Sequence, residues 1–137
     1  MSGEDIASRL RSFFEADHHG ALAVYLFGST ARGSSHPASD VDVALLYREV
    51  SATGTLDSLP LLLKGDVESY LGRKVDVVVL NTASPDLCHR VFRDGILILD
   101  RDRRFRLRFE VKKRNEYLDF LPVLQLYRRY PKRRVRR

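Results

Sequence analysis

Four residues in the first third of the chain have the types and spacing of a site for phosphate and a divalent metal. Gly28 and Ser29 stand together, ten residues separate Ser29 from Asp40, and Asp42 follows two positions later. A glycine lets a phosphate approach the backbone closely, and a serine hydroxyl adds a hydrogen-bond donor. The pattern G-S-x10-D-x-D therefore predicts that a nucleoside triphosphate and its magnesium bind here.

The carboxylates of this pattern define a candidate metal site. Asp40 and Asp42 are expected to project from the same face of a strand, because residues i and i+2 point the same way. Carboxylates side by side repel each other unless a cation lies between them, and oxygen-only ligands favour magnesium or manganese. Asp76, on a later apolar strand, joins the site if the two strands are neighbours; otherwise it would pair with Arg73 or Lys74.

Such a set of groups supports nucleotidyl transfer. Metal ions would orient the triphosphate and stabilise the charge that develops at the α-phosphate. Asp76 would be a further metal ligand or the base that accepts the proton of the attacking hydroxyl. The G-x4-G-K-[ST] pattern of a P-loop does not occur in the sequence.

Alternating helical and strand patterns supply the elements that position these residues. Apolar residues at helical spacing, short β-branched runs and breaker residues predict helices over 4–16, 60–71, 85–92 and 102–127, and strands over 22–27, 41–46, 75–80 and 96–99. A loop, with room for a short helix, joins the first two strands. The order is that of a mixed α/β (α+β) domain with a sheet of about four strands flanked by helices. Residues 1–127 are expected to form this single domain.

The single cysteine, Cys88, rules out an intramolecular disulfide and suits a reducing compartment. No apolar run approaches the roughly 20 residues that span a bilayer, and the first residues lack the layout of a secretory signal. The sequence therefore predicts a cytoplasmic protein.

At this point the sequence resembles a known family. Residues 22–46 and 75–80 resemble the minimal nucleotidyltransferases of the DNA polymerase β superfamily, and residues 4–121 resemble the MNT-type antitoxins encoded beside HEPN-domain toxins. The segments that carry the resemblance are G-S-T-A-R-G (28–33), S-D-V-D (39–42), V-D-V-V-V-L-N (75–81) and R-F-E…Y-L-D-F-L-P (108–122).

The resemblance implies a function as well as a fold. It implies that ATP is the donor, that magnesium is required, and that AMP is transferred to a tyrosine hydroxyl of a partner HEPN-type toxin, which blocks the RNase site of that toxin. The residues that it assigns are Gly28, Ser29 and Arg32 for the nucleotide, and Asp40, Asp42 and Asp76 for metal binding and catalysis.

The basic end of the chain lies outside the resemblance. Residues 128–137 hold seven of the 24 basic residues and no acidic one, so the remainder has 17 basic against 18 acidic residues. A nearly neutral body excludes a uniformly basic nucleic-acid-binding face. The tail is expected either to contact RNA, DNA or an acidic toxin surface, or to be a flexible, solvated end.

Two other functions stay open from the sequence. The protein would be a binding antitoxin if it neutralised by forming a complex without catalysis. It would be a nucleotidyltransferase of another kind if its acceptor were a small molecule or RNA, although such enzymes usually carry a second domain for the acceptor. A sequence-specific DNA binder is least favoured, because no helix-turn-helix pattern is present.

Overall fold

The computed structural model describes residues 3–17, 19–33, 40–48 and 55–129, with backbone alone for 55–60. The helices are α1 (Gly3–Ala16), α2 (Gly28–Ala31), α3 (Thr55–Leu71), the 3-10 helix η1 (Leu80–Thr82), α4 (Pro85–Asp94) and α5 (Arg103–Arg129), and the strands are β1 (Ala23–Phe27), β2 (Val41–Leu46), β3 (Val75–Val79) and β4 (Ile96–Asp100). The mixed α/β fold predicted from the sequence is confirmed.

The four strands form one mixed sheet in the order β3-β2-β1-β4. β1 pairs antiparallel with both β2 and β4, whereas β2 and β3 are parallel. The carboxyl end of β1 therefore lies beside the amino ends of β2 and β3. This edge of the sheet is where the candidate residues were predicted to meet.

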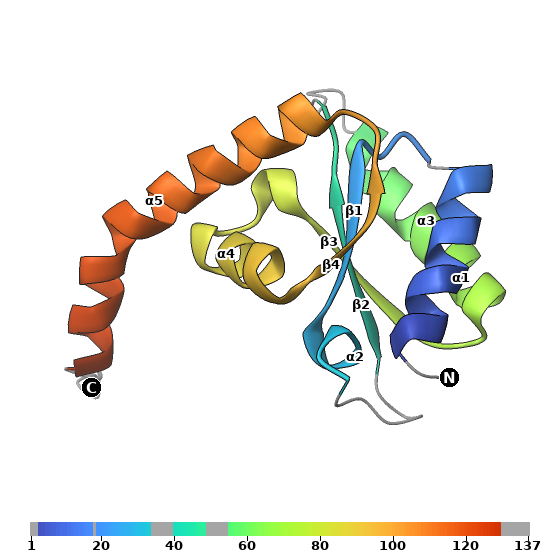
Figure 1. Ribbon diagram of the computed structural model, residues 1–137, viewed down its shortest axis with the longest axis horizontal. Helices are drawn as coiled ribbons and strands as arrows, with labels where there is room; N and C mark the ends of the chain where they lie inside the picture. Colours follow the sequence, from blue (N-terminus) through green and yellow to red (C-terminus); the bar gives the residue numbers. More distant parts are fainter. Residues whose placement is uncertain (1–2, 18, 34–39, 49–54, 130–137) are drawn as a thin grey trace.

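The sheet is covered on both faces (Figure 1), with α1 and α3 on one side and α4 and α5 on the other. Alternate strand residues pack against the two helical layers, because successive side chains of a strand point to opposite faces. Val41, Val43 and Leu45 pack in the core beneath α1 and α3. Ala44 and Leu46 pack in the core beneath α4, so Asp42, which shares their face, opens toward α4.

Local sequence signals explain how α4 begins and ends. The Ser84 hydroxyl accepts a hydrogen bond from the Leu87 N–H at 3.2 Å, and Pro85 is the first helical residue. Both features stabilise a helix start, because the first N–H groups have no partner within the helix. Gly95 ends the helix and leads directly into β4. Cys88 lies fully buried on the inner side of α4.

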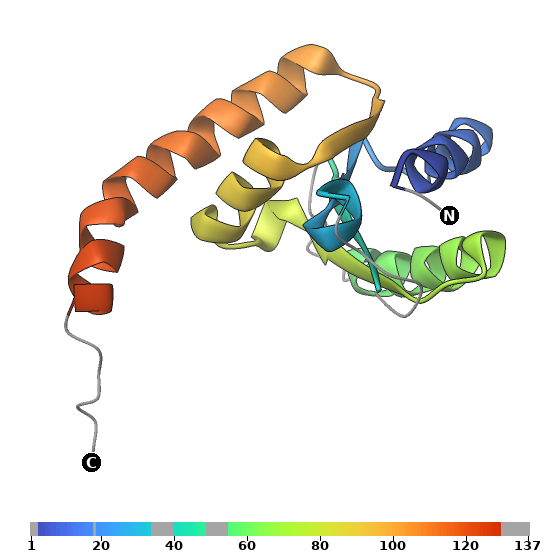
Figure 2. The same cartoon turned by 60° about the horizontal axis from the view of Figure 1, so that its bottom comes forward.

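Two helices differ from their predicted extents. α3 begins at Thr55, five residues before the proline that was expected to open it. α5 contains Pro122 and continues to Arg129, two residues beyond its predicted end. Figure 2 shows the C-terminal half of α5 extending past α4 and away from the sheet.

The first half of α5 is anchored to the sheet by a polar cluster. The Tyr25 hydroxyl of β1 donates to Glu110 Oε2 at 2.6 Å. Arg106 donates to the same carboxylate at 2.9 Å and to Asp100 of β4 at 2.9 Å. Burial and the neighbouring Glu110 carboxylate raise the pKa of Tyr25 far above its usual range, so Tyr25 stays a neutral donor. The cluster fixes how α5 leaves the body of the protein.

Most of the basic tail lies outside the described residues. Arg128 and Arg129 belong to the last turn of α5, and the structure says nothing of 130–137. Across the ranges that the structure describes, none of the helices is long and apolar enough to cross a membrane.

Candidate active site

Three strand ends bring the predicted site residues together. Phe27, the last residue of β1, pairs with Asp42 of β2. Asp42 in turn pairs with Asp76 of the parallel strand β3, so the two carboxylates leave adjacent strands at the same level. Strands lie about 4.8 Å apart, which places the two side chains within reach of one ion. Asp76 was expected to join the site only if its strand were the neighbour of β2. β3 is that neighbour.

Gly28 is required by the close approach of Asp42. Its backbone has a φ of +77°, in the left-handed region that L side chains rarely adopt. A Cβ atom at Gly28 would collide with the Oδ2 atom of Asp42 and would lie 3.0 Å from its Cγ. The glycine thus lets the chain turn sharply after β1 while leaving space for the carboxylate. Ser29 follows in α2, which is a single turn of four residues.

The electrostatics of Asp42 favour a bound cation. Burial, then the carboxylate of Asp76, then that of Asp40 raise the pKa of Asp42 above its ordinary value of 3.8, while the Arg32 guanidinium opposes them. Repulsion between neighbouring carboxylates is relieved when a divalent ion lies between them. The donor set, oxygen atoms alone, fits magnesium.

The carboxylates do not complete a metal shell by themselves. In the described ranges no three His, Cys, Asp or Glu side chains are gathered closely enough to hold an ion. This arrangement suits magnesium, which usually keeps one or two carboxylates and takes its other ligands from substrate phosphates and water. Asp40, which is exposed just before β2, lies near enough to act on the pKa of Asp42.

A cleft of about 480 Å³ opens beside Gly28 and Asp42. Its walls carry three guanidinium groups, from Arg32 after α2 and from Arg90 and Arg93 of α4, together with Phe27, Ser29 and Asp94. Arg93 and Asp94 form two hydrogen bonds of 3.0 and 2.9 Å, and this pairing lowers the pKa of Asp94. The cleft therefore has an excess of positive charge where a triphosphate would bind. We name it the cationic cleft.

A second cleft, of about 700 Å³, meets the first at Phe27 and Asp42. Its walls are mainly apolar, and its charged groups are Asp76 and Lys64 besides Asp42; the apolar lining comes from Phe27, Leu61, Val77, Val78 and Leu87. Asp42 thus stands between a cationic cleft and an apolar one. We name the second the apolar cleft.

The structure brings together five of the six predicted site residues at these two clefts: Gly28, Ser29, Arg32, Asp42 and Asp76. Asp40 lines neither cleft as the structure describes them, but its charge reaches Asp42. Sequence reasoning missed Lys64, Arg90 and Arg93. No sequence signal marked the two arginines, because their approach to the site depends on how α4 packs on the face toward which Asp42 points.

Comparison with known sequences identifies a family. A family described as "Polymerase beta, Nucleotidyltransferase" matches residues 9–104. The chain is 40% identical over 73 residues to the protein adenylyltransferase MntA of Shewanella oneidensis, covering 53% of this chain and 49% of that relative. It is 33% identical over 81 residues to the protein adenylyltransferase MntA of Aphanizomenon flos-aquae, covering 55% of this chain and 54% of that relative. The chain thus spans about half the length of these curated relatives.

Comparison with solved structures extends the likeness beyond the matched sequence. A chain in a crystal structure of a toxin-antitoxin with AMP-PNP superposes with a TM-score of 0.70 at 26% identity. The superposition covers 88% of this chain and 93% of that chain. The similarity therefore includes most of α5, which begins where the family match ends.

Proposed function

Because the chain belongs to the polymerase β nucleotidyltransferase family, we propose that it is a magnesium-dependent protein adenylyltransferase acting as an antitoxin. It transfers AMP from ATP to a tyrosine of a HEPN-type RNase toxin in the cytoplasm and thereby neutralises that toxin. The observation that carries the proposal is the pairing of Asp42 with Asp76 beside the left-handed turn at Gly28, at the junction of two clefts of different character.

ATP binds with its phosphates in the cationic cleft. The backbone at Gly28 and Ser29 receives the phosphates closely, and Arg32 and Arg90 supply charge-assisted hydrogen bonds. Since α2 is one turn long, the helix dipole adds little, and the arginines carry most of the electrostatic attraction. Asp42 and Asp76 would hold magnesium, and Asp40, whose charge acts on Asp42, would be a further ligand. The ion would offset the charge of the triphosphate and favour the deprotonated acceptor oxygen.

The two clefts match the two sides of the transfer reaction. The tyrosine oxygen forms a bond to the α-phosphorus, the bond from that phosphorus to the bridging oxygen breaks, and pyrophosphate leaves. The attacking and leaving oxygens lie roughly in line, so they occupy opposite sides of the phosphorus. With the departing pyrophosphate in the cationic cleft, the phenol enters through the apolar cleft, where Asp76 accepts its proton.

Arg90→Ala is expected to raise the Kd for ATP with magnesium on the order of 10-fold, because one charge-assisted contact to phosphate is lost. Arg101→Ala is the matched control: it removes the same charge from an exposed residue that lines neither cleft, just after β4. Titration of a fluorescent ATP analogue measures both. Equal affinities for the two variants would mean that the phosphates do not lie in the cationic cleft.

Leu61→Ser is expected to lower kcat/KM for the toxin on the order of 10-fold, because the phenol ring loses an apolar wall. Leu61 is 71% exposed, so the fold does not depend on it. Leu62, which is 63% exposed and lines neither cleft, gives the matched control Leu62→Ser. The affinity for ATP should be unchanged in both variants. A loss of ATP affinity in Leu61→Ser would place the nucleotide base in the apolar cleft instead.

The decisive experiment is incubation of the protein with labelled ATP, magnesium and the HEPN-type protein encoded by the neighbouring gene. We expect label on a tyrosine of that protein, located by mass spectrometry, together with loss of its RNase activity. The same mixture with EDTA should give no label. If both proteins are folded and magnesium is present, the absence of label on the HEPN-type protein would refute the proposal.

A further inference from the structure

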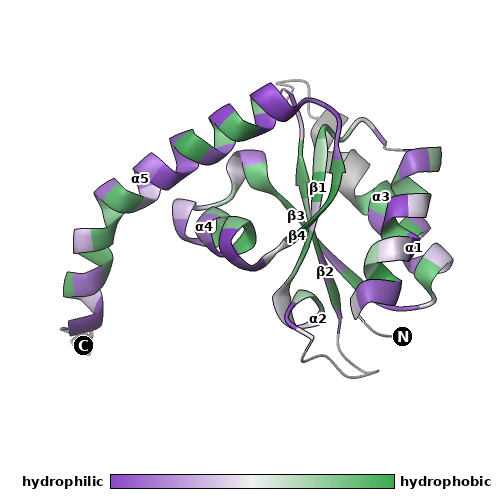
Figure 3. Cartoon of the chain, viewed as in Figure 1, coloured by the Kyte–Doolittle hydropathy of each residue, from purple (hydrophilic) through white to green (hydrophobic). Residues whose placement is uncertain are grey.

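The outer face of α5 is apolar where no described element covers it. α5 has 27 residues, and none of its side chains is buried. Seven of its large apolar side chains are substantially exposed: Leu107 40%, Val111 44%, Leu118 53%, Phe120 40%, Val123 56%, Leu126 56% and Tyr127 65%. Figure 3 shows hydrophobic residues alternating with hydrophilic ones along the whole helix. Exposed apolar side chains that recur along one element are typical of an interaction site.

The same helix has an excess of positive charge, whereas the residues before it have an excess of negative charge. α5 has nine basic and three acidic residues, whereas residues 1–102 have ten basic and 15 acidic ones. The salt bridges of α5 in the described part of the chain use Arg106 and Lys113. Arg108, Lys112 and Arg114 take part in none of these pairs and line the hollows that hold Leu107 and Val111. The same hollows are lined by Glu110 and Glu116, which pair with Arg106 and Lys113, and by Asp119. A partner surface that fits Arg108, Lys112 and Arg114 carries carboxylates around an apolar centre.

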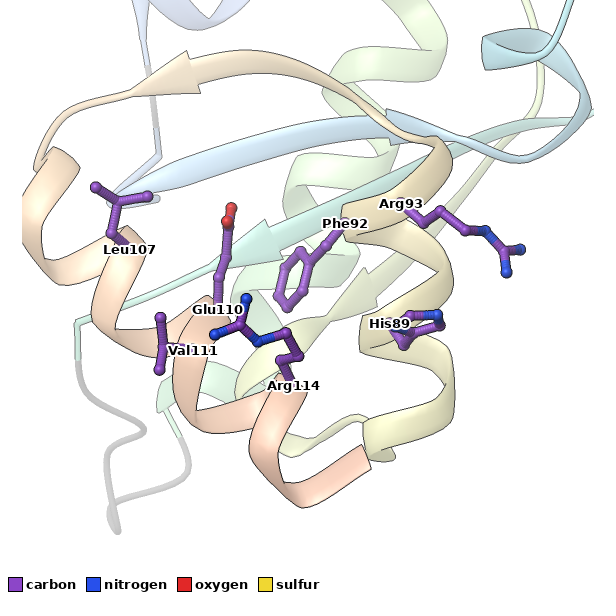
Figure 4. Close-up of a pocket in the computed structure, with 7 residues that line it drawn as sticks. All are labelled: His89, Phe92, Arg93, Leu107, Glu110, Val111 and Arg114. Carbon is purple, nitrogen blue, oxygen red and sulfur yellow. The ribbon is translucent and has the colours of Figure 1, made fainter. Parts of the chain in front are cut away.

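Two hollows connect this face with the cationic cleft. The first, of about 340 Å³, lies between α4 and α5; Figure 4 shows Phe92 of α4 projecting toward α5 there. The second, of about 650 Å³, runs along α5 and shares Leu107 and Val111 with the first. Arg93 lines the first hollow and also the cationic cleft. A molecule bound along α5 therefore lies next to the site of transfer.

We propose that this surface, named the α5 face and formed by Leu107, Arg108, Val111, Lys112, Arg114 and Leu118, docks the protein that accepts AMP. The docked surface of that protein is acidic around an apolar centre. The inference rests on the proposed function for the identity of the partner. It adds the surface to which the partner binds and the charge pattern by which that partner is selected.

The size of the clefts supports a docking surface outside them. A stable protein-protein contact buries about 800 Å² on each partner, far more than a cleft that admits one side chain. A protein acceptor must therefore bind elsewhere on the chain, and close enough to present its tyrosine. RNA is a poorer occupant, since phosphate gains nothing from Leu107 and Val111. Pairing of α5 with α5 of a second copy would bring like charges together.

The test measures complex formation without ATP, so that binding is separated from catalysis. Arg108→Glu with Lys112→Glu is compared with Arg11→Glu with Arg101→Glu, which reverses two exposed charges on α1 and after β4. We expect the α5 variant to bind the neighbouring HEPN-type protein at least about 10-fold more weakly, and the control to bind as the wild type does. Rising salt should weaken wild-type binding more than that of the α5 variant.

Val111→Glu is a second variant, which places a carboxylate at the centre of the α5 face and should weaken binding similarly. Retained affinity for ATP with magnesium shows that each variant is folded. Toxin binding unchanged in both α5 variants overturns the inference, as does absence of wild-type binding. The inference is also overturned if the variants alter only self-association or only RNA binding. If the wild type binds the toxin through the α5 face but transfers no AMP, the proposed function fails while the docking site stands.

Discussion

Asp42→Asn is expected to lower AMP transfer by at least about 10²-fold and also to raise the melting temperature of the metal-free protein. The first effect follows because the charge facing the ion is lost at the junction of the two clefts. The second follows from the repulsion that Asp76 and Asp40 exert on Asp42 in addition to its burial. An uncharged amide of nearly the same shape removes that repulsion.

Because folding raises the pKa of Asp42, the ionised Asp42 side chain destabilises the folded protein. Folding holds the pKa of Asp42 above its ordinary value of 3.8, so the unfolded chain releases this proton first as the pH rises. Protonated Asp42 therefore contributes stability at low pH. This contribution is lost as the pH rises from 3.8 through the raised pKa, and it is absent at pH 7. The variant lacks this loss, so its gain in melting temperature should be largest at pH 7 and shrink toward pH 4.

Magnesium and a matched variant complete this experiment. Magnesium with ATP should raise the melting temperature of the wild type more than that of Asp42→Asn, because ligand binding to the folded state stabilises it. Asp66→Asn, at an exposed carboxylate of α3 that lies 3.7 Å from His19, should leave transfer unchanged. If Asp42→Asn in EDTA at pH 7 melted below the wild type, the account of Asp42 as a destabilised metal ligand would be wrong.

A double substitution separates the enzyme from a binding antitoxin. Asp40→Asn with Asp42→Asn removes two charges and little shape, so a protein that neutralises by complex formation would still protect cells from the toxin. The adenylyltransferase proposed above would not. Because neither aspartate belongs to the α5 face, the double variant should still bind the toxin.

Much of the site was predictable because it depends on local pattern. Short apolar runs predicted all four strands, and period-two alternation placed Asp42 on the face opposite to the buried Val41 and Val43. Only the neighbour relation of β2 and β3 was missing, and it decided whether Asp76 joined the site. Arg90 and Lys64 were not predictable in the same way. Their approach to the clefts depends on how α4 and α3 pack on the sheet, which no periodicity encodes.

For the final helix, the element was predicted correctly but the covering of its apolar residues was not. Its apolar residues predicted an amphipathic helix, and the helix is present over almost the expected range. Phe105 and Phe109 pack against the core beneath α4, but Phe120 is 40% exposed. The apolar pattern continues beyond the body that it was expected to cover. Periodicity shows which side of a helix is apolar. It does not show whether that side packs against the same chain or against another protein.

Gly28→Ala is the second substitution from which we expect a large effect, on both stability and activity. A left-handed backbone costs a residue with a side chain about 1–2 kcal/mol. The added Cβ would also collide with Oδ2 of Asp42 and displace that carboxylate from the junction of the clefts. Since misplacement of a reacting group by about 1 Å can cost on the order of 10²-fold in rate, transfer should fall at least that far.

Gly33→Ala separates the two causes. Gly33 has nearly the same backbone angle, with a φ of +75°, but a Cβ there would meet nothing within 4 Å in the described structure. It should therefore show the backbone cost alone, measured by denaturant unfolding. In a double-mutant cycle, Gly28→Ala should cost less stability when Asp42 is already alanine, because the colliding oxygen is gone. If Gly28→Ala lowered stability no more than Gly33→Ala and kept the affinity for magnesium and ATP, the close contact between Gly28 and Asp42 would have no functional role.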